Sequence, residues 1–189
     1  MPGYEIIDKR EEREIKEIFS SGKVFFAHGF EKQRKGIYRV RNFEKKFSNK
    51  VKTKYSLAVS SGTAALKIAL KSLNIRAGDE VITQPFNFIA TVEAIIDCGA
   101  KPIFTKIDAS LNMDMEDLKK KINIKTKCII PVHMLGFPCD MHKLNLISKI
   151  KNIPIIEDNC ESLMSKYKNQ YCGNLTDIGV FSFDYGKFI

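Results

Sequence analysis

The sequence lacks an apolar run of the roughly 18 residues that a helix needs to cross a bilayer. It also lacks an apolar stretch behind a basic start in its first residues, the pattern of a signal peptide. We therefore expect no membrane contact and a cytoplasmic protein. Internal repeats and low-complexity segments are absent too. A chain of 189 residues, 44% of them hydrophobic, can bury a globular core.

Cysteine pairs of the Cys-x-x-Cys type are also missing. The five cysteines are an odd number, and no two are close enough in sequence to form a zinc ribbon. His133 and His142 flank Cys139 without completing the four ligands of a structural zinc site. We predict no metal site and interpret the thiols as reduced and mostly buried. The cysteines are Cys98, Cys128, Cys139, Cys160 and Cys172.

The net charge of +9 is concentrated near the N-terminus. Residues 1–54 carry 15 Lys and Arg against 8 Asp and Glu, and the remainder carries 16 against 14. No zinc finger, RNP aromatic pattern or sustained basic helix face accompanies the charge. We therefore expect no nucleic-acid partner, while a positive N-terminal region can attract an anionic small substrate.

Two regions are expected along the chain. Residues 1–54 form an N-terminal helical arm, with a helix over 9–20 and an irregular segment over 22–38. Residues 55–189 alternate short apolar runs with helical patterns, which is typical of a parallel α/β sheet. The predicted strands are 56–59, 80–83, 101–105, 128–132, 153–156 and 178–183, and the predicted helices after the first strand begin near 64, 88, 114 and 140.

Repeated strand–helix units of this size predict a doubly wound, mostly parallel sheet. Ligands of such sheets sit beyond the carboxyl ends of the strands. The residues that suggest chemistry all follow predicted strands, and this coincidence indicates one shared site. They are Ser61 to Thr63, Pro85 to Phe88, His133, Asp158 and Ser182 to Lys187.

A first candidate is Ser60-Ser61-Gly62-Thr63, which precedes a predicted helix. Gly62 lets the backbone approach a ligand, and amides at a helix N-terminus favour a phosphate. Ser and Thr also cap helices for purely structural reasons. The segment alone is therefore a weak indication of phosphate binding.

Three other residues have both a functional and a structural interpretation. Asp158 ends an apolar strand and could hold a proton on a heterocyclic nitrogen, or act as a cap or buried ion-pair member. Phe88 could stack on a flat ring, although aromatics near strand ends usually belong to the core. His133 is interpreted, narrowly, as a buried histidine with its hydrogen bonds satisfied.

Lys187 is one of 25 lysines, most of which are expected to be solvated surface charges. Its neighbours Phe181, Phe183, Tyr185 and Phe188 predict mainly apolar and aromatic surroundings. Such surroundings disfavour the charged form of an amine and make it a nucleophile toward a carbonyl. Together, these candidates supply a phosphate cradle, a stacking ring, a carboxylate and an amine.

This set of parts, in this order, resembles the DegT/DnrJ-type sugar aminotransferases, enzymes that use pyridoxal 5'-phosphate (PLP) and act on nucleotide-linked keto sugars. The resemblance covers nearly the whole chain, and its most specific block has a serine five residues before a lysine. The blocks are Pro2 to Glu5, Ser60 to Leu66, Ala77 to Ile82, Phe88 to Thr91, Val132 to Gly136, Ile156 to Asp158 and Phe181 to Lys187.

The resemblance implies a role for each candidate. Lys187 would form the Schiff base with the cofactor and then shuttle a proton between substrate and cofactor. Asp158 would pair with the pyridine nitrogen and keep the ring an electron sink. Phe88 would stack on the ring. Within the resemblance, these residues predict transfer of an amino group, with glutamate as donor, to a keto sugar for glycan or polysaccharide precursors.

The phosphate group has its own implied contacts. Thr63, the amide of Ala64 and Ser182 would hold it, with Gly62 in the same cofactor site. Family members work as homodimers whose sites borrow residues from the partner. We therefore expect a homodimer in the full-length form.

One site position departs from the family pattern. The usual Gln or His three residues after the aspartate is Glu161 here, which puts its contact to the ring hydroxyl of the cofactor in doubt. An acid at this point is similar to the related PLP-dependent sugar dehydratases. Those enzymes replace the lysine with histidine, whereas this chain keeps Lys187. Transamination is therefore preferred to dehydration.

The resemblance also implies the fold, the large domain of a fold-type-I PLP enzyme. Family members continue after the lysine with a last strand of the sheet and a C-terminal domain, and this sequence stops at Ile189. We expect a large domain that is incomplete at its C-terminus. An inactive truncated fragment is the remaining alternative to an aminotransferase.

Overall fold

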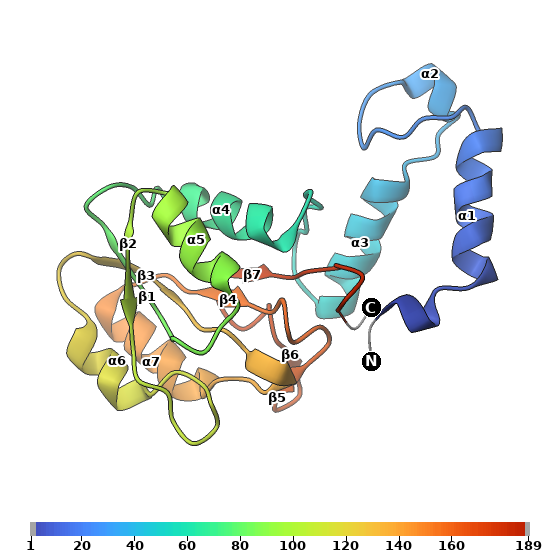
Figure 1. The fold of residues 1–189 in the computed structure, drawn as a ribbon. Helices are drawn as coiled ribbons and strands as arrows, with labels where there is room; N and C mark the ends of the chain where they lie inside the picture. The colour runs from blue at the N-terminus through green and yellow to red at the C-terminus, as the bar shows by residue number, and fades with distance from the viewer. Residues whose placement is uncertain (1–2, 188–189) are drawn as a thin grey trace.

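Five short parallel strands form the centre of the molecule, in the spatial order β2, β1, β3, β4, β7 (Figure 1). The structure is a computed structural model that describes residues 3–187, with side chains from Glu5 onward. Single parallel bridges, Ile129 with Ile155 and Val132 with Asp158, join the β3 and β4 segments. The strands are β1 (Glu80–Thr83), β2 (Lys101–Phe104), β3 (Thr126–Ile130), β4 (Ile156–Asp158) and β7 (Ile178–Val180).

Helices cover both faces of the sheet, as the prediction of a doubly wound α/β fold requires. Figure 1 shows α4 and α5 on one face and α6 and α7 on the other. These helices are α4 (Gly62–Ser72), α5 (Ile89–Asp97), α6 (Met115–Lys121) and α7 (Met141–Lys151). The remaining short elements of this part are η2 (Met134–Gly136) and the antiparallel pair β5 (Lys166–Tyr167) and β6 (Gln170–Tyr171).

The two-residue period of the strands divides the core between these faces. Val81 packs with Leu66 and Leu70 of α4, whereas the next residue, Ile82, packs with Leu144 of α7. Successive side chains of a strand point to opposite faces, so a sheet buried on both faces reads as a continuous apolar run. The mostly parallel sheet and the α/β class are thereby confirmed.

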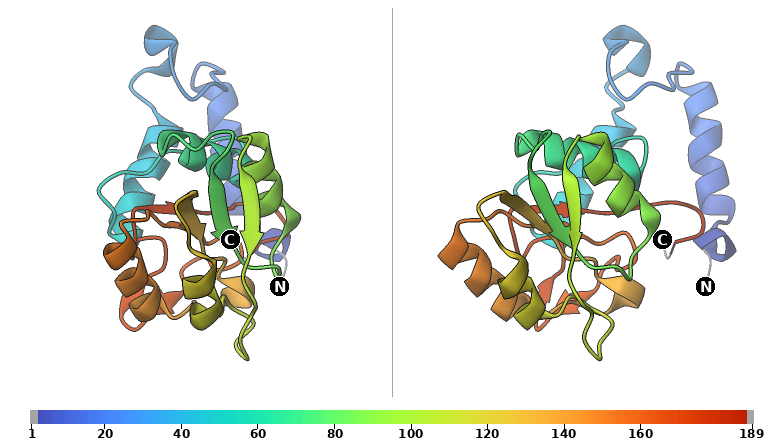
Figure 2. Two further views of the ribbon diagram at one scale, coloured as in Figure 1. Left: turned by 90° about the vertical axis from the view of Figure 1, so that its left-hand side faces the viewer. Right: turned by 60° about the vertical axis from the view of Figure 1, so that its left-hand side comes forward.

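Residues 3–51 form a separate arrangement of helices, of which α1 and α2 stand away from the sheet (Figures 1 and 2). It consists of η1 (Gly3–Ile6), α1 (Lys9–Ser20), α2 (Glu31–Arg34) and α3 (Arg39–Val51). Asp8 begins α1 with a capping box, in which its side chain accepts from the Arg10 amide and Glu11 accepts from the Asp8 amide. The predicted helix over 9–20 is confirmed.

Helix α3 joins this arm to the end of β7 through aromatic rings. Phe47 lies edge-to-face on Phe181 with ring centroids 5.0 Å apart, and Phe43 lies in the same way on Phe183 at 5.2 Å. Such edge-to-face pairs add stabilisation beyond the burial of the rings. The segment that follows β7 is thus fixed against α3.

The strand predicted at 56–59 is wrong, because this segment has no strand pairing. Glu44 of α3 satisfies its polar groups instead: the Glu44 carboxylate accepts from the Ala58 amide at 2.8 Å, and its backbone carbonyl accepts from the Ser56 hydroxyl. The strand predicted at 153–156 is shifted to β4, because regular pairing begins only after Pro154, which has no amide hydrogen to donate.

Within residues 3–187, no helix has the length and apolar character that crossing a membrane requires. Pro2 and Phe188, which the sequence analysis used, lie outside the described residues.

Candidate functional site

The start of α4 presents backbone amides at the carboxyl-end side of the sheet. Ser61 is the N-cap residue, and its hydroxyl accepts from the Ala64 amide at 3.1 Å. The predicted phosphate contact of Ala64 is therefore occupied by the cap in this structure. The amides of Gly62 and Thr63 also belong to the first turn, where a helix offers no acceptor of its own. They are the donors available to an anion.

Gly62 lies in close contact with two other loops. A Cβ atom placed on Gly62 would lie 3.0 Å from the Cys160 sulfur and 3.2 Å from Cβ of Ser182. The α4 N-terminus, the loop after β4 and the loop after β7 therefore meet at one point, as the doubly wound topology predicts. Ser182 and Thr63, both predicted phosphate ligands, are half-buried there.

Asp158 is the last residue of β4 and is only 2% exposed. The Thr91 hydroxyl donates to its Oδ2 atom at 2.7 Å, and the Cys160 amide donates to Oδ1 at 3.1 Å. Each oxygen of an ionised carboxylate accepts more than one hydrogen bond, so both retain capacity for another donor. The side chain is thus a buried acceptor held in a fixed orientation.

Phe88 and Lys187 face each other on the open side of the site. Phe88 is the N-cap residue of α5 and is 58% exposed. The Lys187 ammonium lies 5.3 Å from the centroid of its ring, within the range of a cation–π interaction. Lys187 also forms an ion pair with Glu161, and both side chains are largely shielded from solvent. The predicted site residues are thus gathered around this edge of the sheet.

The surroundings expected for Lys187 are wrong in one respect. Phe181 and Phe183 pack on the α3 phenylalanines and not around the amine, and Tyr185 is exposed. Lys187 has instead one carboxylate and one aromatic face as its neighbours. Phe181 and Phe183 lie away from the amine because they pack on the phenylalanine rings of α3.

Two members of the site were missed by the sequence analysis. Thr91 lies three residues after Phe88, so both occupy one face of α5, and this spacing could have indicated the contact with the site. Cys160 lies between Gly62 and Asp158, and no sequence signal indicated it. Burial first, and the Asp158 carboxylate second, raise the pKa of the Cys160 thiol well above its usual range. The thiol is therefore neutral at neutral pH.

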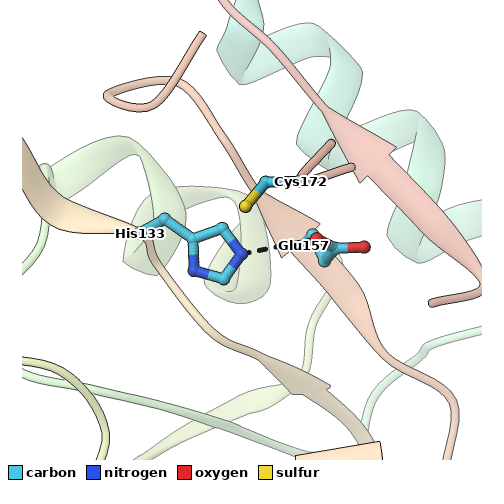
Figure 3. Close-up of side chains that lie close together, drawn as sticks. All are labelled: His133, Glu157 and Cys172. Atoms are coloured by element: carbon cyan, nitrogen blue, oxygen red, sulfur yellow. Dashed lines mark hydrogen bonds and ion pairs between the residues drawn. The ribbon is translucent and has the colours of Figure 1, made fainter. Parts of the chain in front are cut away.

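Among the described residues, one group of three possible metal ligands lies close together: His133, Glu157 and Cys172 (Figure 3). A histidine that binds a metal normally donates its other ring N–H to an acceptor. Here Nδ1 of His133 accepts from the Cys139 amide at 3.2 Å, so Nε2 carries the hydrogen and points at Glu157 Oε2, 3.4 Å away. Burial also raises the pKa of the Cys172 thiol to about 12. His133 and Glu157 therefore belong to a hydrogen-bonded network, and the neutral Cys172 thiol lies beside them.

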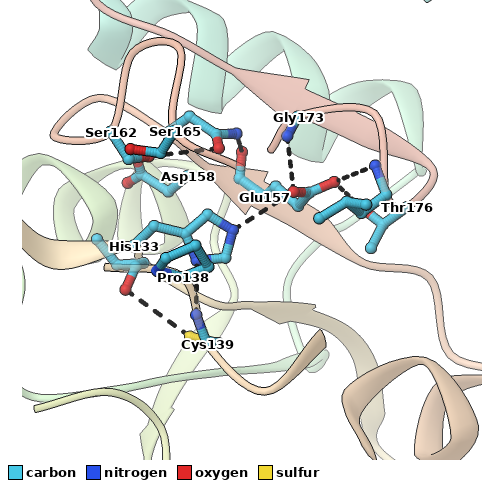
Figure 4. A network of polar contacts seen from close by, with 12 residues as sticks. His133, Pro138, Cys139, Glu157, Asp158, Ser162, Ser165, Gly173 and Thr176 are labelled. Atoms are coloured by element: carbon cyan, nitrogen blue, oxygen red, sulfur yellow. Dashed lines mark hydrogen bonds and ion pairs between the residues drawn. The ribbon is translucent and has the colours of Figure 1, made fainter. Parts of the chain in front are cut away.

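Glu157 is the centre of that network, which Figure 4 shows. Its carboxylate accepts from the Gly173 amide at 2.7 Å, the Leu175 amide at 2.8 Å and the Thr176 hydroxyl at 3.0 Å, besides His133. The adjacent carboxylates Glu157 and Asp158 therefore act on opposite sides of β4. Glu157 fixes the loop before β7, and Asp158 faces the candidate site.

Comparison with known proteins gives the same fold and one family. The profile of the DegT/DnrJ/EryC1/StrS aminotransferase family matches residues 7–189. A GDP-perosamine synthase of Escherichia coli O157:H7 is 44% identical over 156 residues, which are 82% of this chain and 43% of that protein. The chain spans about half the length, or less, of the curated relatives it matches.

Solved structures agree with this result. An aminotransferase from Psychrobacter cryohalolentis has a TM-score of 0.87 and 34% identity, covering 96% of this chain and 44% of that one. Spr1654 of Streptococcus pneumoniae, solved in a PLP form and a PMP form, has a TM-score of 0.87 and 29% identity, covering 98% of this chain and 48% of its own.

Proposed function

Because the chain belongs to the DegT/DnrJ/EryC1/StrS aminotransferase family, we propose that the whole protein uses PLP to transfer an amino group from glutamate to a nucleotide-linked keto sugar. The product would enter the synthesis of a glycan or polysaccharide precursor. The observation that carries the proposal is the meeting of Lys187, Phe88 and Asp158 at the carboxyl-end edge of a parallel sheet.

The residues present fit PLP. Asp158 has a buried carboxylate with free acceptor capacity, which suits a protonated ring nitrogen. Gly62 and Thr63 present amides at a helix N-terminus, which suit a phosphate, with Ser182 beside them. When bound, PLP supplies an aldehyde for the amine and a ring that withdraws electrons.

In this proposal each side chain has one task. Lys187 provides the amine and carries a proton at Nζ, Phe88 provides an exposed face for the ring, and Asp158 holds the ring nitrogen. Glu161 belongs to the same site through its contact with Lys187. Retention of a lysine at position 187 favours amino transfer over sugar dehydration.

We extend the proposal to assembly and location. A homodimer is proposed for the full-length protein, supported by apolar side chains that α1 leaves exposed, Ile15 and Phe19 among them. A cytoplasmic location is proposed from the nucleotide-linked substrate. Sedimentation of the full-length protein, with and without PLP, tests the dimer.

The experiment for the function is a titration of the chain with PLP, followed by its visible absorption band. We expect a band that borohydride fixes covalently on Lys187 and that Lys187→Ala abolishes. Lys67→Ala, which removes a surface lysine paired with Asp97, is the matched control and should retain the band. Added glutamate should then bleach the band. Absence of an adduct on Lys187 in the folded whole protein, treated in the same way, would contradict the proposal.

A further inference from the structure

Glu161 and Lys187 form a pair in which neither side chain is freely solvated. Oε1 of Glu161 contacts Nζ of Lys187, and the two side chains are 26% and 21% exposed. On its other side, the ammonium meets the face of Phe88. The three residues come from three loops, after β4, after β7 and before α5. The amine thus lies between a carboxylate and an aromatic face.

A carboxylate next to an amine stabilises the ammonium, and an ammonium has no lone pair with which to attack a carbonyl. We propose that Glu161 is the resting partner of Lys187, which holds the amine in an ion pair and away from other reactants until an aldehyde ligand displaces the carboxylate.

The inference rests on the proposed function for the identity of the aldehyde, which is PLP. The reaction that the ion pair delays is the formation of a C=N bond between Lys187 and the aldehyde. Lys187 first loses one proton to solvent as it leaves Glu161. Its nitrogen then bonds to the aldehyde carbon, the two remaining protons of the amine pass to the oxygen in turn, and the C–O bond breaks as water departs to leave a C=N bond. Glu161 enters only through the first of these events.

Other charged or titratable groups near the pair do not account for the effect. Cys160, which lies between Asp158 and the pair, has a thiol that burial keeps neutral. Asp158 is held by Thr91 and the Cys160 amide. Asp184, on the segment of Lys187 itself, accepts from the Gly186 amide. Glu161 is the carboxylate that contacts the amine.

The first test uses no cofactor. The chain is acetylated at neutral pH with trace acetic anhydride, and the labelling rate of Lys187 is measured by peptide mapping against the other lysines in the same digest. We expect Glu161→Gln to raise the rate by roughly fivefold, the scale of a partly exposed ion pair. Asp184→Asn removes a nearby negative charge without touching the pair and should leave the rate within twofold. Equal rates in wild type and Glu161→Gln would overturn the inference.

The second test follows PLP capture, trapped by borohydride, as a function of pH. Glu161→Gln should capture PLP faster than wild type near pH 7. The two rates should converge toward about pH 10, where lysine loses its proton unaided. Glu161→Asp keeps the charge and should resemble wild type. Slower capture by Glu161→Gln would overturn the inference, because it would mean that Glu161 promotes the reaction of Lys187 with PLP. Absence of any adduct would instead contradict the proposed function, while the acetylation result still decides the pairing.

Discussion

The Thr91 hydroxyl donates a 2.7 Å hydrogen bond to Oδ2 of Asp158, and both side chains are at most 2% exposed. The bond links helix α5 to the end of β4. Because Phe88 is the N-cap residue of the same helix, one element supplies both the exposed ring and the donor that orients the carboxylate. Thr91 is therefore a positioning residue for the candidate site.

Replacement of Thr91 by valine should impair cofactor binding with little change in shape. Asp158 would lose one of its two protein donors while remaining buried, which costs roughly 1–3 kcal/mol. We expect PLP affinity to fall about tenfold, with a changed visible band. Thr91→Ser keeps the hydroxyl and should restore most of the affinity and the original band. A Thr91→Ser variant as weak as Thr91→Val would refute the role of the hydroxyl.

The strands of the sheet were largely predictable, because each is a short apolar run bounded by turn residues. Glu80–Thr83, between Gly78 and Pro85, was predicted with its observed limits. The segment 56–59 has the same local pattern but is no strand. The Ala58 amide in this segment donates to the Glu44 carboxylate of α3, and no local sequence pattern connects these two residues. Whether an apolar run becomes a strand is therefore decided by the long-range contacts of its backbone, and not by the run itself.

Glu157→Gln tests the network on the other side of β4. All four groups that meet the Glu157 carboxylate are donors, so the NH₂ group of glutamine would face N–H or O–H hydrogens in either orientation. We expect the free energy of unfolding to fall by about 3 kcal/mol in urea denaturation. Glu116→Gln removes an exposed ion pair with Lys119 and should cost less than about 1 kcal/mol. Equal effects would show that the Glu157 network adds no stability.

Alanine variants of Gly173 and Gly36 separate the cost of backbone strain from the cost of a steric overlap. Both have a left-handed φ, +85° and +81°, but a Cβ atom on Gly36 would meet nothing, whereas one on Gly173 would overlap the Phe181 ring. Gly36→Ala should cost about 1 kcal/mol from backbone strain alone. Gly173→Ala should cost at least about 3 kcal/mol, because Phe181 is also packed on Phe47. Similar unfolding midpoints for both variants would contradict this packing.

The location of the candidate site in the fold was predictable, whereas the contacts between its residues were less so. Parallel strands end at one edge, so Asp158 and the Lys187 segment were expected to meet there. The sequence predicted aromatic surroundings for Lys187 from its neighbours along the chain. Phe181 and Phe183 pack on α3 instead, and the contact of Lys187 with Glu161 was not predicted. The half-buried ion pair with Glu161 joins positions 26 residues apart, a separation at which local sequence carries no pairing signal.

Two buried thiols should make the fold sensitive to alkali. Burial raises the pKa of Cys128 and of Cys139 to about 12 in the folded chain, from an ordinary value near 9. Between these values the unfolded chain loses protons that the folded chain keeps. The stabilisation is therefore complete below about pH 9 and is lost as pH rises toward 12, at about 1.4 kcal/mol per pH unit for each thiol.

The measurement is the free energy of unfolding in urea at pH 8 and pH 10, with each variant compared with itself. Because tyrosines and lysines also titrate in this range, the informative quantity is the difference between variants. Cys139→Ala should lose about 1 kcal/mol less than wild type between the two pH values. Met141→Ala truncates the same core cluster without removing a titrating group, so it should be less stable yet keep the wild-type pH dependence. An unchanged pH dependence in Cys139→Ala would mean that its thiol ionises in the folded state as readily as in the unfolded state, and that this part of the core admits water.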